Sequence, residues 1–404
     1  MKKIIGPFSQ IVTMQRMPLK GALAEEQLDI INDGAVVVKD GIIKAVGDFT
    51  SLYNMHPDAG VEPIDQPAVL LPGFIDCHTH ICFGGSRSKD YAMRVAGKSY
   101  LEIARSGGGI WSSVEMTRAA THAELLQTLS ARIKRHYSEG ITTIEIKSGY
   151  GLNVETELKM LRAIQEAALI ADADIVATCL AAHIKPKDFD GDEKSYLKYL
   201  VTHLWPVIKK EKLCSRADIF IEETAFCAAD ATAYLMAVEL LGNQTTVHAD
   251  QFSASGSTVA VQTRAHSADH LEASGPKEIE ALAKSQTVAV VLPGASIGLG
   301  MPFAPARKLL DAGACVAIAS DWNPGSAPQG DLLLQAAIMG AYEKITMAET
   351  LAGLTVRAAH ALRLSDRGVI AKGMKAHMQA YPTYDFREIL YQQGKLKPFQ
   401  VWVN

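Results

Sequence analysis

The sequence lacks long hydrophobic runs and long blocks of like charge. No uninterrupted apolar stretch reaches the ~18 residues of a transmembrane helix, and the first residues lack the apolar core of a signal peptide. The net charge is −4 with 21% charged residues, and the densest charged run is only Lys209-Lys210-Glu211-Lys212. We therefore expect no membrane partner, no nucleic-acid partner and a cytoplasmic location.

Paired cysteines are also missing. Six cysteines in 404 residues, none at CxxC spacing, are typical of mostly buried thiols in a reducing compartment, so we expect no disulfides. Cys77 and Cys82 flank two histidines but match no zinc-ribbon pattern, so we expect them to pack in the core. No GxGxxG follows the first strand of the main domain, which argues against a dinucleotide-binding sheet.

What the sequence does contain is an apolar run that ends in His-x-His. Residues 69–77 predict one buried strand, and His78 and His80 follow it. Because residues i and i+2 of a strand point the same way, both imidazoles should face one point. Neutral imidazole is the commonest protein ligand for zinc and related ions, so we interpret the pair as part of a metal site.

The chain alternates between strand and helix patterns over most of its length. From about residue 66 to 363, apolar strands alternate with amphipathic helices, which predicts parallel pairing. Eight strands are expected, at 69–77, 141–147, 174–182, 217–222, 245–248, 265–270, 287–292 and 315–321. Eight such units favour a closed (β/α)₈ barrel of the TIM type, an α/β fold; an open doubly wound sheet is the alternative.

Helices are expected at 122–139, 155–171, 193–211, 228–241, 276–285, 304–312 and 348–362. Thr121 and Glu124 form a capping box, and Gly140 is placed to end the first of these helices. Short β-rich segments mark both chain ends, with Asp33-Gly34 and Asp40-Gly41 as predicted hairpin turns. Residues 1–65 and 364–404 should therefore form a small β-sandwich domain beside the 66–363 barrel.

Polar side chains gather where the predicted strands end. They are His78, His80, Lys147, His183, Glu222, Glu223, His248, Asp250, Gln251, Asp269, His270 and Asp321. Since the carboxyl ends of barrel strands form one mouth, a shared site explains this placement better than separate packing roles.

Within that set, the candidate metal ligands are His78, His80, His248 and Asp321. A metal ion with an open position lowers the pKa of a bound water from 15.7 toward about 7, so such a site hydrolyses its substrate. One metal is the expectation, but Lys147 leaves an alternative open, because a carbamylated lysine there could bridge two metals.

His270 has two interpretations. It either polarises a carbonyl or orients the water, or it is a buried histidine that is bonded to Asp269.

The stretch 72–80, followed by the strand-five histidine and the strand-eight aspartate, resembles the amidohydrolase superfamily. Within it the chain resembles the imidazolonepropionase family, through motifs at 80–87, 106–110, 145–152, 181–183, 248–251, 267–272 and 320–326. The resemblance implies hydrolytic ring opening of 4-imidazolone-5-propanoate, a small anionic substrate, to N-formimidoyl-L-glutamate in histidine degradation. It also implies one zinc or iron ion per chain, and we expect a homodimer.

The same resemblance implies roles for residues at the mouth. Arg87 would pair with the propanoate carboxylate, for which a guanidinium fork is well shaped. The residues that would line the ring or the product are Tyr150, His183, Asn323, Gly325 and Ser326.

Gln251 stands where some family members have Glu. An amide cannot accept a proton at neutral pH, so Gln251 can only hydrogen-bond and orient, and we expect Asp321 and His270 to share the acid/base work. A second departure is the segment 372–380, which lacks the Gly-Lys-x-Ala-Asp-Leu run usual in amidohydrolases.

Two other functions are compatible with these residues. One is a mononuclear deaminase of purine-like or pyrimidine-like rings, which would release ammonia. The other is a non-catalytic assembly protein on the same fold, which would need no metal.

Overall fold

Eight parallel strands form the larger of two sheets. The computed structural model describes residues 2–98 and 100–403. The strands are β6 (Phe74–Asp76), β7 (Ile141–Lys147), β8 (Asp174–Ala182), β9 (Arg216–Ile219), β10 (Gln244–Ala249), β11 (Ser267–His270), β12 (Val288–Val291) and β13 (Val316–Ile318). They lie side by side in this order, each parallel to its neighbour, and the predicted α/β barrel is confirmed.

The first and last strands of this sheet are joined through the residues that follow them. Thr79 and Trp322 form a parallel bridge. The Asp321 amide donates to the His78 carbonyl at 3.1 Å, and the His80 amide donates to the Trp322 carbonyl at 2.9 Å. The segments that carry three of the predicted metal ligands are therefore held against each other by backbone hydrogen bonds.

The prediction of one strand at 69–77 is wrong. The run contains two strands, β5 (Val69–Pro72) and β6, which belong to different sheets. Between them the Gly73 amide donates to the His377 carbonyl at 2.9 Å, and a Cβ at Gly73 would overlap Thr142. An apolar run reports burial but not which sheet buries it, so the crossing at Gly73 was not visible in the pattern.

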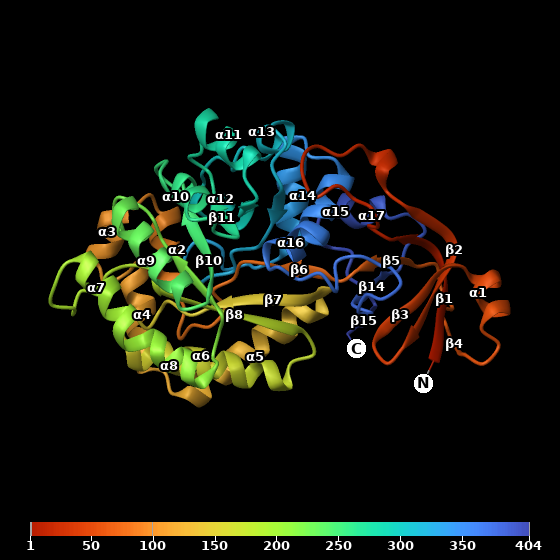
Figure 1. Ribbon diagram of the computed structural model, residues 1–404, viewed down its shortest axis with the longest axis horizontal. Helices are drawn as coiled ribbons and strands as arrows, with labels where there is room; N and C mark the ends of the chain where they lie inside the picture. The colour runs from red at the N-terminus through yellow and green to blue at the C-terminus, as the bar shows by residue number, and fades with distance from the viewer. Residues whose placement is uncertain (1, 99, 404) are drawn as a thin grey trace.

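Both chain ends meet in a second sheet of seven strands (Figure 1). Its other strands are β1 (Lys2–Val12), β2 (Ile30–Lys39), β3 (Ile42–Asp48), β4 (Gly60–Pro63), β14 (Met378–Tyr381) and β15 (Gln400–Trp402). The first part of β1 pairs with β4 and a later part pairs with β5. Strand β14 pairs with β5 and with β15, so the end of the chain returns to this sheet as expected.

Only one of the two predicted hairpin turns exists. Asp40-Gly41 joins β2 to β3, and both residues have positive φ, 51° and 71°. Asp33-Gly34 lies inside β2 instead, close to the point where the register of β1 on β2 shifts. There the positive φ of Asp33, 49°, accommodates an irregularity of pairing, because β1 is long enough to continue the ladder past it.

Helices cover the outside of the barrel (Figure 1). They are α2 (Ser88–Val95), α3 (Tyr100–Arg105), α4 (Ile110–Ala119), α5 (His122–Ser138), α6 (Val154–Ile170), α7 (Glu193–Tyr199), α8 (Trp205–Glu211), α9 (Ala228–Leu240), α10 (Gly256–Gln262), α11 (Pro276–Lys284), α12 (Pro293–Leu299), α13 (Ala306–Asp311), α14 (Leu332–Glu343), α15 (Met347–Leu354) and α16 (Val356–Ala361). Two more, α1 (Phe49–Met55) and α17 (Arg387–Tyr391), accompany the second sheet and the C-terminal segment.

The predicted capping box of α5 is confirmed, and Gly140, at φ 91°, follows that helix. The predicted helix 193–211 is interrupted by a π turn at Leu200–Leu204, just before Pro206, and the predicted helix 348–362 breaks at Thr355. Proline removes an amide donor from the helix ladder, which accounts for the first interruption. The short helices α2, α3 and α4, between β6 and β7, were not predicted.

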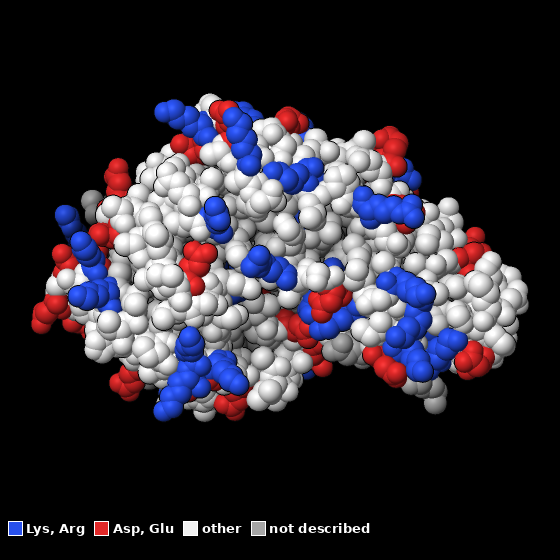
Figure 2. Space-filling model, in the orientation of Figure 1, with Lys and Arg blue, Asp and Glu red and all other residues white. Residues whose placement is uncertain are grey.

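Lysine and arginine side chains are interspersed with aspartate and glutamate over the otherwise uncharged face shown in Figure 2. Within residues 2–98 and 100–403, no helix combines the length and the apolar character needed to cross a membrane.

Candidate metal centre and active site

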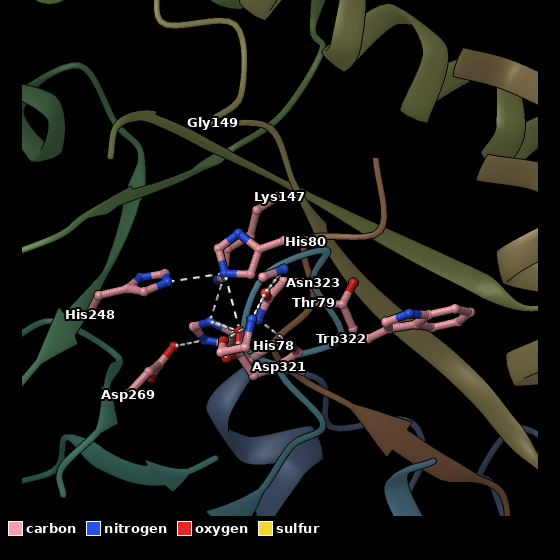
Figure 3. Close-up of polar contacts among 12 residues, drawn as sticks. His78, Thr79, His80, Lys147, Gly149, His248, Asp269, Asp321, Trp322 and Asn323 are labelled. Atoms are coloured by element: carbon pink, nitrogen blue, oxygen red, sulfur yellow. Dashed lines mark hydrogen bonds and ion pairs between the residues drawn. The ribbon is translucent and has the colours of Figure 1, made fainter. Parts of the chain in front are cut away.

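Three imidazoles meet at the carboxyl end of the barrel strands (Figure 3). His78 and His80 follow β6, and His248 lies in β10. The Nε2 of His80 lies 3.2 Å from the Nε2 of His78 and 3.1 Å from the Nε2 of His248. The Oδ1 of Asp321, after β13, is 3.4 Å from the Nε2 of His80 and 3.7 Å from that of His78. The structure thus brings all four predicted ligands together.

Buried carboxylates hold the other nitrogen of two of these rings. The Nδ1 of His78 is 2.7 Å from Oδ2 of Asp269, and the Nδ1 of His248 is 3.0 Å from Oδ2 of Asp218. Because a carboxylate accepts, each Nδ1 carries the proton and each Nε2 presents a lone pair to the centre. One ligand nitrogen from each of His78, His80 and His248 lies within 4.8 Å of the other two, so this donor set fits a metal ion.

The pKa values of the candidate ligands also favour a metal site. Burial lowers the pKa of His78 and His80 well below the usual value, and lowers that of His248 to about 4. Neutral imidazole is the form that binds metals. Burial also raises the pKa of Asp321 to about 7, and a cation beside the carboxylate would oppose that effect.

Lys147 is engaged with two acids. Its Nζ lies 2.8 Å from Oε1 of Glu145 and 2.9 Å from Oδ2 of Asp218. Burial alone would lower the pKa of Lys147, but Asp218 and Glu145 together raise it above the usual value. An ammonium group cannot form a carbamate, so this arrangement disfavours the alternative in which Lys147 bridges two metals.

His270 borders the centre from β11. Its ring centroid lies 5.9 Å from that of His78 and 5.3 Å from that of His248. Its Nδ1 is 3.5 Å from Oε1 of Glu272, which leaves Nε2 as the nitrogen available to a reactant. Among the described residues no hydrogen bond or ion pair joins His270 to Asp269, and the carboxylate that faces Nδ1 of His270 is that of Glu272.

Four of the non-glycine residues with positive φ lie at or next to this centre. Among the residues described, non-glycine examples include Asp250, His270, Leu271 and Asp321, at 54°, 89°, 75° and 50°. Such conformations cost about 1–3 kcal/mol each and persist where the surroundings impose them. At Asp321 the surroundings include the hydrogen bond from its backbone amide to the His78 carbonyl, which joins the two ends of the barrel sheet.

Arg87, the predicted partner of the substrate carboxylate, lies on the rim of this mouth. Its Nε donates to Oδ2 of Asp90 at 2.9 Å, and the same oxygen accepts the Gly109 amide at 2.8 Å. A Cβ at Gly325 would overlap the Nη1 of Arg87, so the guanidinium lies directly against that glycine. The Arg87 side chain is only 11% exposed, so its charge is partly desolvated and strongly oriented.

Tyr150 and His183 form a wall beside His80. The His183 ring is stacked on His80 with centroids 5.6 Å apart, and the Tyr150 ring centroid is 5.6 Å from His183. The Nδ1 of His183 donates to the Gly149 carbonyl at 3.0 Å. Burial lowers the pKa of His183 to about 3, so this ring is neutral at physiological pH.

Asn323 shapes the loop after Asp321 with its own side chain. Its Oδ1 accepts the Gly325 and Ser326 amides at 2.7 Å and 2.8 Å, and its Nδ2 donates to the Asp321 carbonyl at 2.7 Å. The Ser326 hydroxyl lies 3.4 Å from Oδ2 of Asp321. The amide of Asn323 is therefore committed to holding the loop, while Ser326 contacts the second oxygen of Asp321.

Gln251 is buried in a loop that is anchored on both sides. On one side Asp250 accepts the Ser257 amide at 3.1 Å. On the other, Oε1 of Glu222 accepts the Phe252 amide at 2.8 Å. These contacts give Asp250 and Glu222 roles in positioning the loop.

Some residues were misjudged from sequence. Glu223 is exposed, and among the described residues no hydrogen bond or ion pair joins it to the four candidate ligands. Asp218 and Glu145, which were not among the candidates for this site, are fully buried inside β9 and β7. A carboxylate in a buried strand is costly unless it is paired, and that was a signal available in the sequence.

Comparisons with known proteins agree with this geometry. The profile of the amidohydrolase family matches residues 103–387. Imidazolonepropionase of Deinococcus deserti is 39% identical over 398 residues, which is 98% of this chain and 96% of the relative. That of Deinococcus radiodurans is 40% identical over 390 residues, 96% of this chain and 94% of the relative.

Solved structures share the fold at low identity. An adenosine deaminase from Xanthomonas campestris with bound zinc has a TM-score of 0.70 at 18% identity, covering 99% of this chain and 91% of that one. A guanine deaminase from C. acetobutylicum with bound guanine has a TM-score of 0.70 at 14% identity, covering 100% and 99%. At such identities the likeness concerns the fold alone.

Proposed function

Because the chain belongs to the amidohydrolase family and, within it, to the imidazolonepropionases, we propose how its residues divide the hydrolytic ring opening of 4-imidazolone-5-propanoate. The chain is a hydrolase that acts on the C–N bond of a cyclic amide. The observation that carries the residue assignment is the convergence of three Nε2 atoms and one Asp321 oxygen at the strand ends.

One zinc or iron ion per chain is the proposed cofactor, held by His78, His80, His248 and Asp321. When bound, such an ion supplies a Lewis acid that lowers the pKa of water and polarises a carbonyl. Support for one ion comes from Lys147, whose ammonium group lies 2.9 Å from Asp218.

Arg87 binds the propanoate carboxylate in this proposal. Asp90 holds the Nε of Arg87, so the two terminal nitrogens remain to form a bidentate pair with the substrate. Tyr150 and His183 line the ring and exclude water. The mouth also contains Asp321 and Glu272, so a cation on the rim is needed to admit an anion.

The hydrolysis adds water to the ring carbonyl carbon and breaks its bond to the adjacent ring nitrogen. The carbonyl becomes a carboxylate, and the departing nitrogen takes a proton and stays on the formimidoyl group. His270 moves this proton at Nε2, while Oδ2 of Asp321 accepts a proton from the attacking water. Gln251 orients water or substrate by hydrogen bonding, since an amide cannot take up the proton.

The test is an absorbance assay with 4-imidazolone-5-propanoate generated in situ from urocanate. We expect loss of the imidazolone absorbance with formation of N-formimidoyl-L-glutamate and without ammonia. Ammonia release from a purine or pyrimidine, with no turnover of the imidazolone, would identify a deaminase instead. A homodimer and a cytoplasmic location stay predictions, and light scattering on the metal-loaded protein tests the first.

A further inference from the structure

A buried glutamate, Glu157, holds the loop that carries Tyr150. Glu157 lies in the first turns of α6 and is 0% exposed. Its Oε1 accepts the Gly151 amide at 2.7 Å and the Leu152 amide at 2.8 Å, and its Oε2 accepts the Gly149 amide at 3.0 Å. Tyr150 is thus flanked on both sides by amides that are bound to a single carboxylate.

The two glycines of this loop are needed for the approach of the carboxylate. A Cβ at Gly151 would lie 2.6 Å from the Glu157 amide nitrogen and 2.9 Å from its Oε1. Gly149 has φ 114°, which side chains with a Cβ rarely adopt, and a Cβ there would lie 2.9 Å from the Leu180 carbonyl oxygen. The two glycines of the segment 148–151 therefore allow the loop backbone to lie against Glu157.

The same contacts continue to His183. Gly149 donates its amide to Glu157 and accepts the Nδ1–H of His183 at its carbonyl, both at 3.0 Å. That bond sets the tautomer of His183, so its Nε2 presents a lone pair. Glu157 is thus linked to His183 by two hydrogen bonds, both made by Gly149. It also binds the amides of the residues on either side of Tyr150.

A helix-capping role does not account for Glu157. The N-cap of α6 is Asn153, whose side chain accepts the Thr156 amide at 2.8 Å. Burial raises the pKa of Glu157, and bonds from Ser148 and the three loop amides oppose that effect. A carboxylate that is buried at such a cost, and that accepts three amide hydrogen bonds from one loop, serves that loop.

We propose that Glu157 is a positioning residue for substrate binding, which fixes Tyr150 and His183 at the distance and orientation that the imidazolone ring needs. This inference rests on the proposed function, because it assumes that those two residues line the substrate.

The test compares Glu157→Gln with Glu155→Gln, a control on the same helix whose side chain is exposed. The substitution at Glu157 puts an NH₂ group against a loop N–H where a carboxylate oxygen accepted, so the loop shifts. We expect KM to rise about tenfold or more, because small misplacements of binding groups can cost up to about 10²-fold. The metal content and kcat should change less than KM, and Glu155→Gln should match the wild type.

A double-mutant cycle with His183→Asn separates positioning from general destabilisation. If Glu157 acts through this wall, adding Glu157→Gln to His183→Asn should raise KM by less than about threefold. Should Glu157→Gln fail to fold, Gly151→Ala displaces the same loop and should produce the same rise in KM.

The outcomes are distinguishable. No turnover of the imidazolone by the wild type would overturn the proposed function and this inference together. If the wild type turns over the imidazolone, two results would overturn only the role of Glu157. One is an unchanged KM in metal-loaded Glu157→Gln, and the other is fully additive effects in the cycle. An unchanged KM in Gly151→Ala would do the same if Glu157→Gln does not fold.

Discussion

The Nδ1 of His248 lies 3.0 Å from Oδ2 of Asp218, and that same oxygen lies 2.9 Å from the ammonium group of Lys147. Burial alone would raise the pKa of Asp218, but His248 and Lys147 hold it below the usual value. The aspartate therefore stays ionised, keeps the proton of His248 on Nδ1 and directs Nε2 to the centre. Lys147 acts on the metal centre through this aspartate.

Replacement of Asp218 should weaken metal binding. Asp218→Asn removes the charge that orients His248 and leaves the buried Lys147 with one acid fewer, so we expect about 10–100-fold lower metal affinity. Competition with a graded series of chelators measures the affinity directly. Asp172→Asn, at an exposed aspartate, is the matched control, and equal affinities in the two variants would contradict the role of Asp218.

Alanine at His78, His80 or His248 should remove the metal. Each substitution takes away one nitrogen of a small donor set, so metal analysis of the purified variants should find far less than one ion per chain. The wild type should contain one zinc or iron. Two ions per chain in a fully active wild type would show that the centre is binuclear.

Loss of Arg87 should reduce activity through the substrate carboxylate. An unpaired, partly desolvated carboxylate costs on the order of 2–4 kcal/mol, so kcat/KM of Arg87→Ala should fall by that free energy. Asp90→Asn should give a smaller loss, because the guanidinium remains but loses its anchor. If Arg87→Ala lowers kcat/KM by less than about fivefold, which is about 1 kcal/mol, the carboxylate binds elsewhere.

His270 and Gln251 should respond differently to substitution. His270→Asn removes the group that moves the proton, so kcat should fall by roughly 10²–10⁴-fold while the metal is retained. Gln251→Glu should keep activity, because a carboxylate can also hydrogen-bond to water. Single-turnover kinetics on metal-replete enzyme measures the step, and near-normal kcat of His270→Asn from about pH 6 to 9 would remove His270 from the mechanism.

Stability should fall in mild acid because of His377. This histidine lies at 2% exposure between the second sheet and the barrel, and burial together with Arg367 lowers its pKa to about 4. A folded-state pKa below the unfolded value of ~6.5 means that stability is full above about pH 6.5 and is lost as the pH falls toward 4.

The size of this effect is about 2–3 kcal/mol, from the linkage between pKa and unfolding free energy. Urea unfolding at pH 7.5 and pH 5 should therefore show a larger loss for the wild type than for His377→Gln, which cannot titrate. Comparison between the two proteins removes the contribution of the metal-binding histidines. The same loss in both would show that His377 is not the group responsible.

Local patterns in the sequence identified most of the barrel and the centre of the site. The alternation of apolar strands with amphipathic helices depends on burial of one face, so the barrel strands after the first could be placed from nearby residues alone. The capping box at Thr121 is local in the same way. The four predicted ligands, which the structure brings together, could be named because several imidazole and carboxylate groups at successive strand ends are hard to explain as packing.

Tertiary structure decided which strands pair in which sheet and which polar side chains contact each other. The split at Gly73 depends on Thr142 and His377, and the irregularity at Asp33 depends on the length of β1. Asp269, which orients His78, is 191 residues away from it in the chain. A carboxylate stabilises an imidazole only when folding brings the two within hydrogen-bond distance, so sequence names the groups and the closed barrel selects their partners.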